Sequence, residues 1–259
     1  RLLTGSFDAQ VRMWDLNTGQ KLAQLGGHRS WVRGVAFLPG SQQAVSCSND
    51  RIIILWDLKT GSMDKVMQGH AGPVSCISAA GDGRHIVTGG PDMTVRLWNV
   101  HTEQQLNVMR SHVATVRSVT FVPGSNYVAS TGDDRDVRVW NPFSGECLAE
   151  LSGHEGNVTD VAVNRSAGRV VSASVDRTAR ILKLPPLNGE PSLDDLVQKP
   201  PTPLLGESAT PVEPIRKWST GQRGLQSIAV LPNGQRIATG GEGGVVRIWN
   251  PETGQLERE

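Results

Sequence analysis

The chain has 259 residues, with 26 Lys and Arg against 25 Asp and Glu, and its formal charge of +1 does not favour a nucleic-acid-binding surface. The longest apolar run, 52–56, is far shorter than the roughly 20 residues that cross a bilayer, and no secretory leader opens the chain. These features predict a soluble, cytoplasmic protein without membrane insertion. Three widely spaced cysteines, Cys47, Cys76 and Cys147, predict small core residues rather than a disulfide framework or a metal site.

A period of 42 residues runs through the sequence. A Trp recurs four times at this spacing. One period after the fourth Trp the residue is Leu182, and Trp249 follows Leu182 by one period plus 25 residues. Because several residue types share the spacing, it cannot be a chance effect of composition. The regular series are Trp14, Trp56, Trp98 and Trp140; His28, His70, His112 and His154; Asp8, Asp50, Asp92, Asp134 and Asp176; and Thr4, Ser46, Thr88, Ser130 and Ser172.

Each period contains four short runs of alternating apolar residues, as in 116–121, 127–131, 137–140 and 147–151. Turn formers separate the runs and leave no room for a helix. The pattern predicts four antiparallel strands per repeat. A four-stranded unit of about 40 residues cannot bury both faces alone, so we expect an all-β fold in which the units pack face to face around a ring, a β-propeller.

Paired Gly-His and Trp-Asp or Trp-Asn residues mark the ends of these units. They are Gly27-His28, Gly69-His70, Gly153-His154 with the variant Ser111-His112, and Trp14-Asp15, Trp56-Asp57, Trp98-Asn99, Trp140-Asn141 and Trp249-Asn250. Through these residues, the chain outside 185–214 resembles the WD-repeat β-propeller family. The short sequences at 231–235 and 249–254 resemble bacterial-type members of that family. The resemblance implies blades whose strands, lettered a to d, run outward from the ring axis.

On this lettering the chain opens at strand b of a first blade and ends near strand d of a sixth, so 1–259 is expected to form a single WD-repeat propeller domain with an incomplete ring. About five and a half to six blades are present. Two explanations stay open: a partner segment supplies the missing strand, or the native ring has seven blades and continues in a longer, multidomain chain. We favour the second. The first residue is Arg1 rather than Met, which separately predicts that the chain is a piece of something longer.

The segment 185–214 differs in composition from the repeats. It holds eight of the 15 prolines and five acidic residues against Lys199 alone. Such a Pro-rich acidic sequence predicts a flexible insertion in the c-to-d loop of the fifth blade. Within it, 192–197 could form a single capped helical turn, and 200–203 fits either a polyproline docking pattern or a plain linker.

His, Ser or Thr, and Asp recur together in each repeat, a combination that could suggest a nucleophilic triad. A triad needs one such set beside an oxyanion hole and a substrate pocket, so its repetition in every blade favours a structural role. We therefore predict no enzymatic activity, no cofactor and no metal site. The resemblance implies buried hydrogen-bonded tetrads made of His28, Ser46, Asp50 and Trp56; His70, Thr88, Asp92 and Trp98; and His112, Ser130, Asp134 and Trp140.

The last two repeats depart from this pattern. The fifth has Leu182 in the place of Trp, and the sixth has Gly221 and Gly243 where His and Asp would stand. These losses predict faster amide exchange in 158–184 and 225–250 than in 74–140.

Five arginines stand two residues before the strand-c Trp position. They could form a phosphate-binding ring, but we prefer the interpretation that their aliphatic stems lie between the sheets while the charged heads reach solvent. They are Arg12, Arg96, Arg138, Arg180 and Arg247.

The resemblance also implies that partners dock on the face that carries the d-to-a and b-to-c loops, here called the top face. Trp31 with Arg33 combines two residue types that are enriched in interface hot spots, and Phe7 could extend this patch. Trp31 could equally fill a gap between blades, and a local ion pair is the expected role of Arg117 with Asp133. The full set of partner-binding candidates is Phe7, Trp31, Arg33, Thr115, Arg117, Asp133 and Asn157.

These features predict a non-enzymatic scaffold that binds a peptide or protein segment on the propeller top face. The alternative is a regulatory or substrate-recruiting domain of a larger multidomain enzyme. A propeller with its own catalytic pocket is disfavoured, because no acid, base or metal cluster stands outside the repeating positions. Nucleic-acid binding is disfavoured as well.

Overall fold

The computed structural model describes residues 1–40, 42–164, 168–184, 187, 189–193, 216–222, 224–231 and 234–259. The described chain forms strands β1 to β23 in six antiparallel sheets, which confirms the predicted all-β fold. Over the same residues, no helix has the length and apolar character needed to cross a membrane.

Each sheet is a meander of strands that follow one another along the chain. Four strands per repeat are confirmed in five sheets, and the first sheet has three. The first two sheets are β1 (Leu2–Gly5), β2 (Gln10–Trp14) and β3 (Lys21–Gly26), then β4 (Val32–Phe37), β5 (Gln43–Ser48), β6 (Ile52–Asp57) and β7 (Ser62–Gln68). The next two are β8 (Cys76–Ala79), β9 (His85–Gly89), β10 (Val95–Asn99) and β11 (Gln105–Met109), then β12 (Val116–Phe121), β13 (Val128–Gly132), β14 (Val137–Asn141) and β15 (Glu146–Leu151). The last two are β16 (Val158–Asn164), β17 (Arg169–Ser174), β18 (Thr178–Lys183) and β19 (Arg216–Ser219), then β20 (Leu225–Val230), β21 (Ile237–Gly241), β22 (Val246–Trp249) and β23 (Leu256–Arg258).

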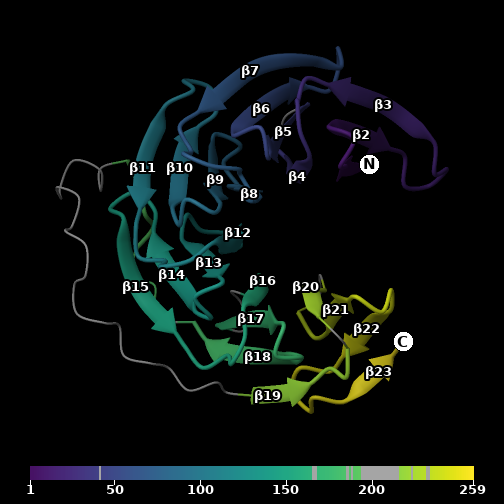
Figure 1. Cartoon of the computed structure of the whole chain (residues 1–259), viewed down its shortest axis with the longest axis vertical. Helices are drawn as coiled ribbons and strands as arrows, with labels where there is room; N and C mark the ends of the chain where they lie inside the picture. The colour runs from purple at the N-terminus through teal and green to yellow at the C-terminus, as the bar shows by residue number, and fades with distance from the viewer. Residues whose placement is uncertain are drawn as a thin grey trace.

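The sheets stand as blades around a common centre, in chain order along an arc (Figure 1). Strands β4, β8, β12, β16 and β20 are the inner strands, and each contacts the next one around the centre. Strands β3, β7, β11, β15, β19 and β23 form the perimeter. This order places strand a of each blade innermost and strand d outermost.

The hydrophobic cores lie between neighbouring blades. Trp98, in strand c of the third blade, is buried against Val45, Cys47 and Leu55 of the second blade. Leu182, which replaces the Trp in the fifth blade, packs in the same way against Val139 of the fourth. Each blade is therefore stabilised by the next one, as a repeat that cannot bury its own faces requires.

A left-handed residue closes each b-to-c turn. Ala9, Arg51, Met93, Arg135 and Arg177 all have φ between 61° and 74°, and they stand 42 residues apart. The preceding Asp stabilises the turn, as when Asp50 Oδ1 accepts a hydrogen bond from Ile52 N at 3.2 Å. The left-handed residue is exposed in the second to fifth blades and half-buried in the first.

Asp160, in β16 of the fifth blade, forms hydrogen bonds with residues of the fourth and sixth blades. Its carboxylate accepts a hydrogen bond from Ser118 Oγ of the fourth blade (2.7 Å) and one from Ile228 N of the sixth (2.9 Å). It also accepts from Val161 N at 2.9 Å. Burial raises the pKa of this carboxyl above its ordinary value, against the effect of these hydrogen bonds.

The Pro-rich segment connects β18 to β19, which pair antiparallel as strands c and d of the fifth blade. Its described beginning lies against the fourth blade, where Asn126 Nδ2 donates to Pro191 O (2.9 Å) and Tyr127 Oη donates to Gly189 O (3.3 Å). Leu187 packs against the adjoining core. This short piece thus has contacts with the fourth blade, and the expectation of a flexible loop stays a prediction. The expected turn at 192–197 beyond Leu193, the polyproline pattern at 200–203 and most of the rest of 185–214 lie outside the described residues.

Candidate functional site

The repeating polar residues form buried networks inside the blades. In the second blade, Trp56 Nε1 donates to Ser46 Oγ (2.8 Å), Ser46 Oγ lies 2.7 Å from His28 Nε2, and His28 Nδ1 lies 2.9 Å from Asp50 Oδ2. A neutral imidazole that accepts at Nε2 and donates at Nδ1 satisfies every member of this chain. The same contacts join His70, Thr88, Asp92 and Trp98, and also His112, Ser130, Asp134 and Trp140.

Burial favours the neutral imidazole of His28 and of His112 in two of these networks, because it lowers the pKa of each. It lowers the pKa of His112 below its ordinary value, although the neighbouring Asp134 opposes the shift. Burial alone would raise the pKa of Asp134, but the hydrogen bonds and charges of His112 and Arg138 outweigh it and lower that pKa to about 2. Ser130 Oγ is buried and its hydrogen bonds to His112 and Trp140 are internal to the blade, so the geometry fits a structural tetrad.

The sixth blade keeps a network that the sequence period does not reveal. Gln222 is buried in the place of the missing His: its Oε1 accepts from Thr239 Oγ1 at 2.7 Å, and its Nε2 donates to Val245 O at 2.8 Å. Trp249 Nε1 then donates to Thr239 Oγ1 at 2.9 Å. The 42-residue period aligns Gly221, not Gln222, with the His of the other blades. Gln222 therefore lies one residue out of phase, and the sequence period does not identify it.

The interpretation that the strand-c arginine heads reach solvent is wrong for three of the five. Arg96, Arg138 and Arg180 are buried. Arg96 Nη1 donates to Gly69 O (2.7 Å) and to Gln105 Oε1 (2.6 Å), and Arg138 pairs with Asp134. At the ends of the arc, Arg12 pairs with Asp8, and Arg247 Nη1 donates to Thr220 O at 2.6 Å. Four of the five guanidiniums thus have a partner within the chain, which argues against a phosphate-binding ring.

Three of the predicted partner-binding residues meet on the top face. Phe7 and Trp31, from the first and second blades, stack with ring centroids 4.4 Å apart and an interplanar angle of 30°. Arg33 Cζ lies 5.2 Å from the Trp31 ring centroid and 5.9 Å from that of Phe7. Phe7 is 66% exposed and Trp31 44% exposed, so Trp31 does not merely fill a gap between blades. We call these three residues the aromatic stack.

The aromatic stack and the predicted ion pair occupy matching positions in two blades. In the fourth blade, Arg117 Nε and Nη2 donate to the two carboxylate oxygens of Asp133 at 2.8 Å and 2.6 Å, which confirms the expected pair. In the second blade, Arg33 Nε donates to Asn49 Oδ1 at 2.9 Å. Because Asn49 is neutral, the charge of Arg33 is not compensated by its partner, whereas the charge of Arg117 is.

The other two candidates, Thr115 and Asn157, are half-buried at the matching d-to-a positions. Their carbonyl groups accept backbone hydrogen bonds from Asp133 N (2.9 Å) and Val175 N (3.0 Å). The structure thus places them on the top face but away from the aromatic stack, in the fourth and fifth blades. Within the described chain, no group of three or more His, Cys, Asp or Glu residues could hold a metal ion.

Comparison with known proteins agrees with this geometry. The family described as "WD domain, G-beta repeat" matches at 19–57, 61–99, 103–141, 145–182 and 213–250, well over half of the chain. A stretch of 41 residues is 49% identical to the Lissencephaly-1 homolog of Branchiostoma floridae, which is 16% of this chain and 10% of that protein. The matched stretch is thus only a tenth of that relative's length. The family matches and the six sheets show that the chain belongs to the WD40 repeat family.

Proposed function

We propose that this protein is a non-enzymatic interaction scaffold that binds a peptide or protein segment on its top face, with the aromatic stack at the centre of the contact. WD40 repeats generally mediate protein-protein interaction, which gives the class of function. The observation that carries the site is an exposed Phe7–Trp31 pair beside a guanidinium whose partner is neutral. Aromatic and Arg side chains in such a cluster are the usual hot spots of protein interfaces.

The stack is held in place before any partner arrives. Ring stacking and the cation–π contacts of Arg33 each contribute on the order of 0.5–1.5 kcal/mol, and the bond to Asn49 fixes the guanidinium further. Side chains that are already ordered lose less entropy on binding. We propose that Thr115, Arg117, Asp133 and Asn157 contribute at most peripheral contacts, because Arg117 and Asp133 already satisfy each other.

The proposal is tested by measuring the affinity of partners captured with the intact chain, and of the same partners for Trp31→Ala and Arg33→Ala. Lys59→Ala, in an exposed c-to-d turn of the same blade, is the control. We expect at least about a tenfold loss for the two stack variants and no change for the control. Equal affinity for all of the folded variants would remove the stack from the interface.

Asn49→Asp gives a second test, because it copies the neutralising partner of the fourth blade without touching the rings. A partner that uses the charge of Arg33 should bind Asn49→Asp more weakly than the wild type, and one that uses only the rings should not. The variant therefore separates the two contributions of the stack.

The alternative proposal is that the propeller serves as a regulatory or substrate-recruiting domain of a larger multidomain enzyme, with a bacterial origin. The family match is compatible with this alternative as well, because WD40 repeats generally mediate protein-protein interaction. Recovery of the full-length gene distinguishes the proposals: a catalytic domain in the same chain would favour the alternative.

A further inference from the structure

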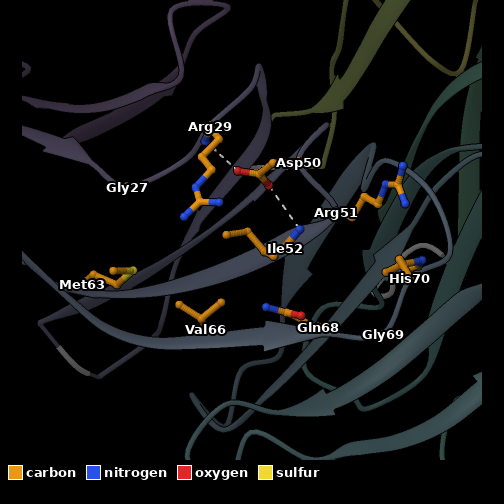
Figure 2. Close-up of a pocket in the computed structure, with 10 residues that line it drawn as sticks. All are labelled: Gly27, Arg29, Asp50, Arg51, Ile52, Met63, Val66, Gln68, Gly69 and His70. Atoms are coloured by element: carbon orange, nitrogen blue, oxygen red, sulfur yellow. Dashed lines mark hydrogen bonds between the residues drawn. The ribbon is translucent and has the colours of Figure 1, made fainter.

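A groove of about 500 Å³ opens in the second blade, where the top-face loops meet the perimeter strand β7. Its floor is apolar and consists of Ile52, Met63 and Val66. Figure 2 shows Met63, Val66 and Gln68 following one another along β7, with Ile52 facing them. We call this space the blade-2 groove.

The second blade differs from the third at two matching positions. In the third blade, Arg96 is buried and donates to Gly69 O and Gln105 Oε1. One period earlier, the positions of Arg96 and Gln105 are occupied by Ile54 and Met63. Ile54 is buried and apolar, so the second blade has no guanidinium at the position from which Arg96 donates to Gly69 O and Gln105 Oε1 in the third.

Comparison with the fourth blade shows that two acidic partners of the strand-c arginine are also absent from the second blade. In the fourth blade, Arg138 pairs with Asp136 and Glu150 as well as with Asp134. The positions of Asp136 and Glu150 are Ile52 and Val66 in the second blade. The two carboxylates that hold the internal guanidinium are thus replaced together with it. The blade-2 groove therefore has an apolar floor and is not shaped to receive a cation from a partner.

Two free cations stand at the rim of this floor. Arg29 comes from the d-to-a loop and Arg51 from the b-to-c turn, on either side of Asp50 (Figure 2). The Asp50 carboxylate is already engaged by His28 Nδ1 (2.9 Å), Arg29 N (2.8 Å) and Ile52 N (3.2 Å). In the described part of the chain, neither guanidinium pairs with a carboxylate.

We propose that the blade-2 groove binds an acidic peptide segment of a partner protein, with a bulky apolar side chain on the floor and carboxylates on the guanidiniums of Arg29 and Arg51. Charge complementarity favours carboxylates at the rim. Met63, 49% exposed, offers an adaptable apolar surface for the side chain that enters. The groove shares no residue with the aromatic stack, so the two proposals can fail separately.

The test uses the full chain and an N-acetylated nonapeptide with one central leucine, two glutamates on each side and glycine and serine elsewhere. The comparison peptides replace the leucine by alanine, or the glutamates by lysines. Isothermal titration calorimetry at low salt should show the leucine-glutamate peptide binding about tenfold tighter than either one. Equal binding of the lysine or alanine peptide would overturn the proposal, as would no binding at all or full competition by inorganic phosphate.

Variants locate the site. Arg29→Glu and Arg51→Glu should each weaken the leucine-glutamate peptide about tenfold. Arg135→Glu is the matched control, because Arg135 has the same turn position and left-handed backbone as Arg51 but lies in the fourth blade. An equal loss in Arg135→Glu, or unchanged binding in the two groove variants, would place the peptide elsewhere.

Filling the groove gives the reciprocal test. The triple variant Ile52→Thr, Ile54→Arg and Met63→Gln installs the third blade's residues in the second, so it should abolish peptide binding. Should the triple variant not fold, Met63→Trp places a bulky indole at an exposed lining position of the groove and should give the same loss. Undiminished binding by a folded variant of either kind contradicts the proposal. Trp31→Ala should leave this peptide's affinity unchanged, which separates the groove from the aromatic stack.

Discussion

Thr239 Oγ1 donates a hydrogen bond to Gln222 Oε1 at 2.7 Å, and this contact rebuilds in the sixth blade what His and Ser or Thr form elsewhere. An amide oxygen accepts as an imidazole Nε2 does, and the amide nitrogen uses its donor on Val245 O. The sixth blade therefore keeps the hydrogen bond from Trp249 to Thr239 without a His or an Asp.

Gln222→Ala should destabilise the fold by about 1–3 kcal/mol, because it leaves the buried Thr239 hydroxyl and Val245 carbonyl without their partner. Urea unfolding of the whole chain measures this loss. Gln255→Ala, an exposed position in the same blade, is the control and should change stability by less than about 0.5 kcal/mol. Equal stability of the two variants would mean that Gln222 is not part of the network.

Trp98→Phe should also destabilise the chain, since phenylalanine keeps most of the apolar contact but cannot donate to Thr88 Oγ1. The expected loss is about 1–3 kcal/mol in urea unfolding, and Trp98→Ala should lose ~3–5 kcal/mol through the cavity as well. Trp31→Phe provides the comparison at a half-exposed Trp and should be close to neutral. A neutral Trp98→Phe would show that packing alone holds the tetrad Trp.

Acidification should weaken the fold in two steps. Burial lowers the pKa values of His28, His112 and His154, so below pH ~6.5 the unfolded chain binds protons that the folded chain does not, and stability falls. Each group contributes a slope of at most about 1.4 kcal/mol per pH unit. Asp134, with its pKa near 2, adds stability that is lost as the pH falls from ~3.8 toward that value.

Urea unfolding between pH 7.5 and pH 5 measures the first step, and His112→Gln should make the slope shallower because that group no longer titrates. A stability that rises on acidification over this range would contradict the assignment of neutral, buried histidines.

Asp160→Ala should loosen the contact between the fourth, fifth and sixth blades. The amide of Ile228 loses its acceptor, so its hydrogen exchange should accelerate by more than that of amides in the third blade. Loss of the three hydrogen bonds should lower stability by about 1–3 kcal/mol. Asp64→Ala, on the exposed side of β7, is the control. Unchanged exchange at Ile228 would show that the carboxylate is not needed to join the blades.

The periodic features of the sequence predicted the four-stranded sheets, because they depend on residue types that recur at fixed spacing. The inner and outer strands and the three tetrads were implied by the resemblance to WD-repeat proteins. The pairing of Arg117 with Asp133 was also predictable, since both stand in one blade on facing loops. The expectation of faster exchange in the fifth and sixth blades stays a prediction, and the network around Gln222 makes it weaker for the sixth.

The departures from periodicity could not be predicted. Gln222 is one residue out of phase, and only the path of the backbone shows that its side chain enters the blade. The burial of the Arg96 guanidinium depends on its acceptors Gln105 Oε1 and Gly69 O, which come from a strand and a loop separated from Arg96 in the sequence. The apolar lining of the blade-2 groove comes from Ile52, Met63 and Val66 together, an effect of packing that no single position indicates.

Hydrogen exchange of the chain with and without a bound partner tests most directly whether the top face is the interaction surface. Binding at the aromatic stack should slow the amides of 5–8, 30–34 and 48–50, which surround Phe7, Trp31 and Arg33, while the c-to-d turn at 57–61 on the opposite face stays unchanged. Protection confined to the c-to-d turns or to the perimeter strands, with no change around Trp31, would contradict the proposed function.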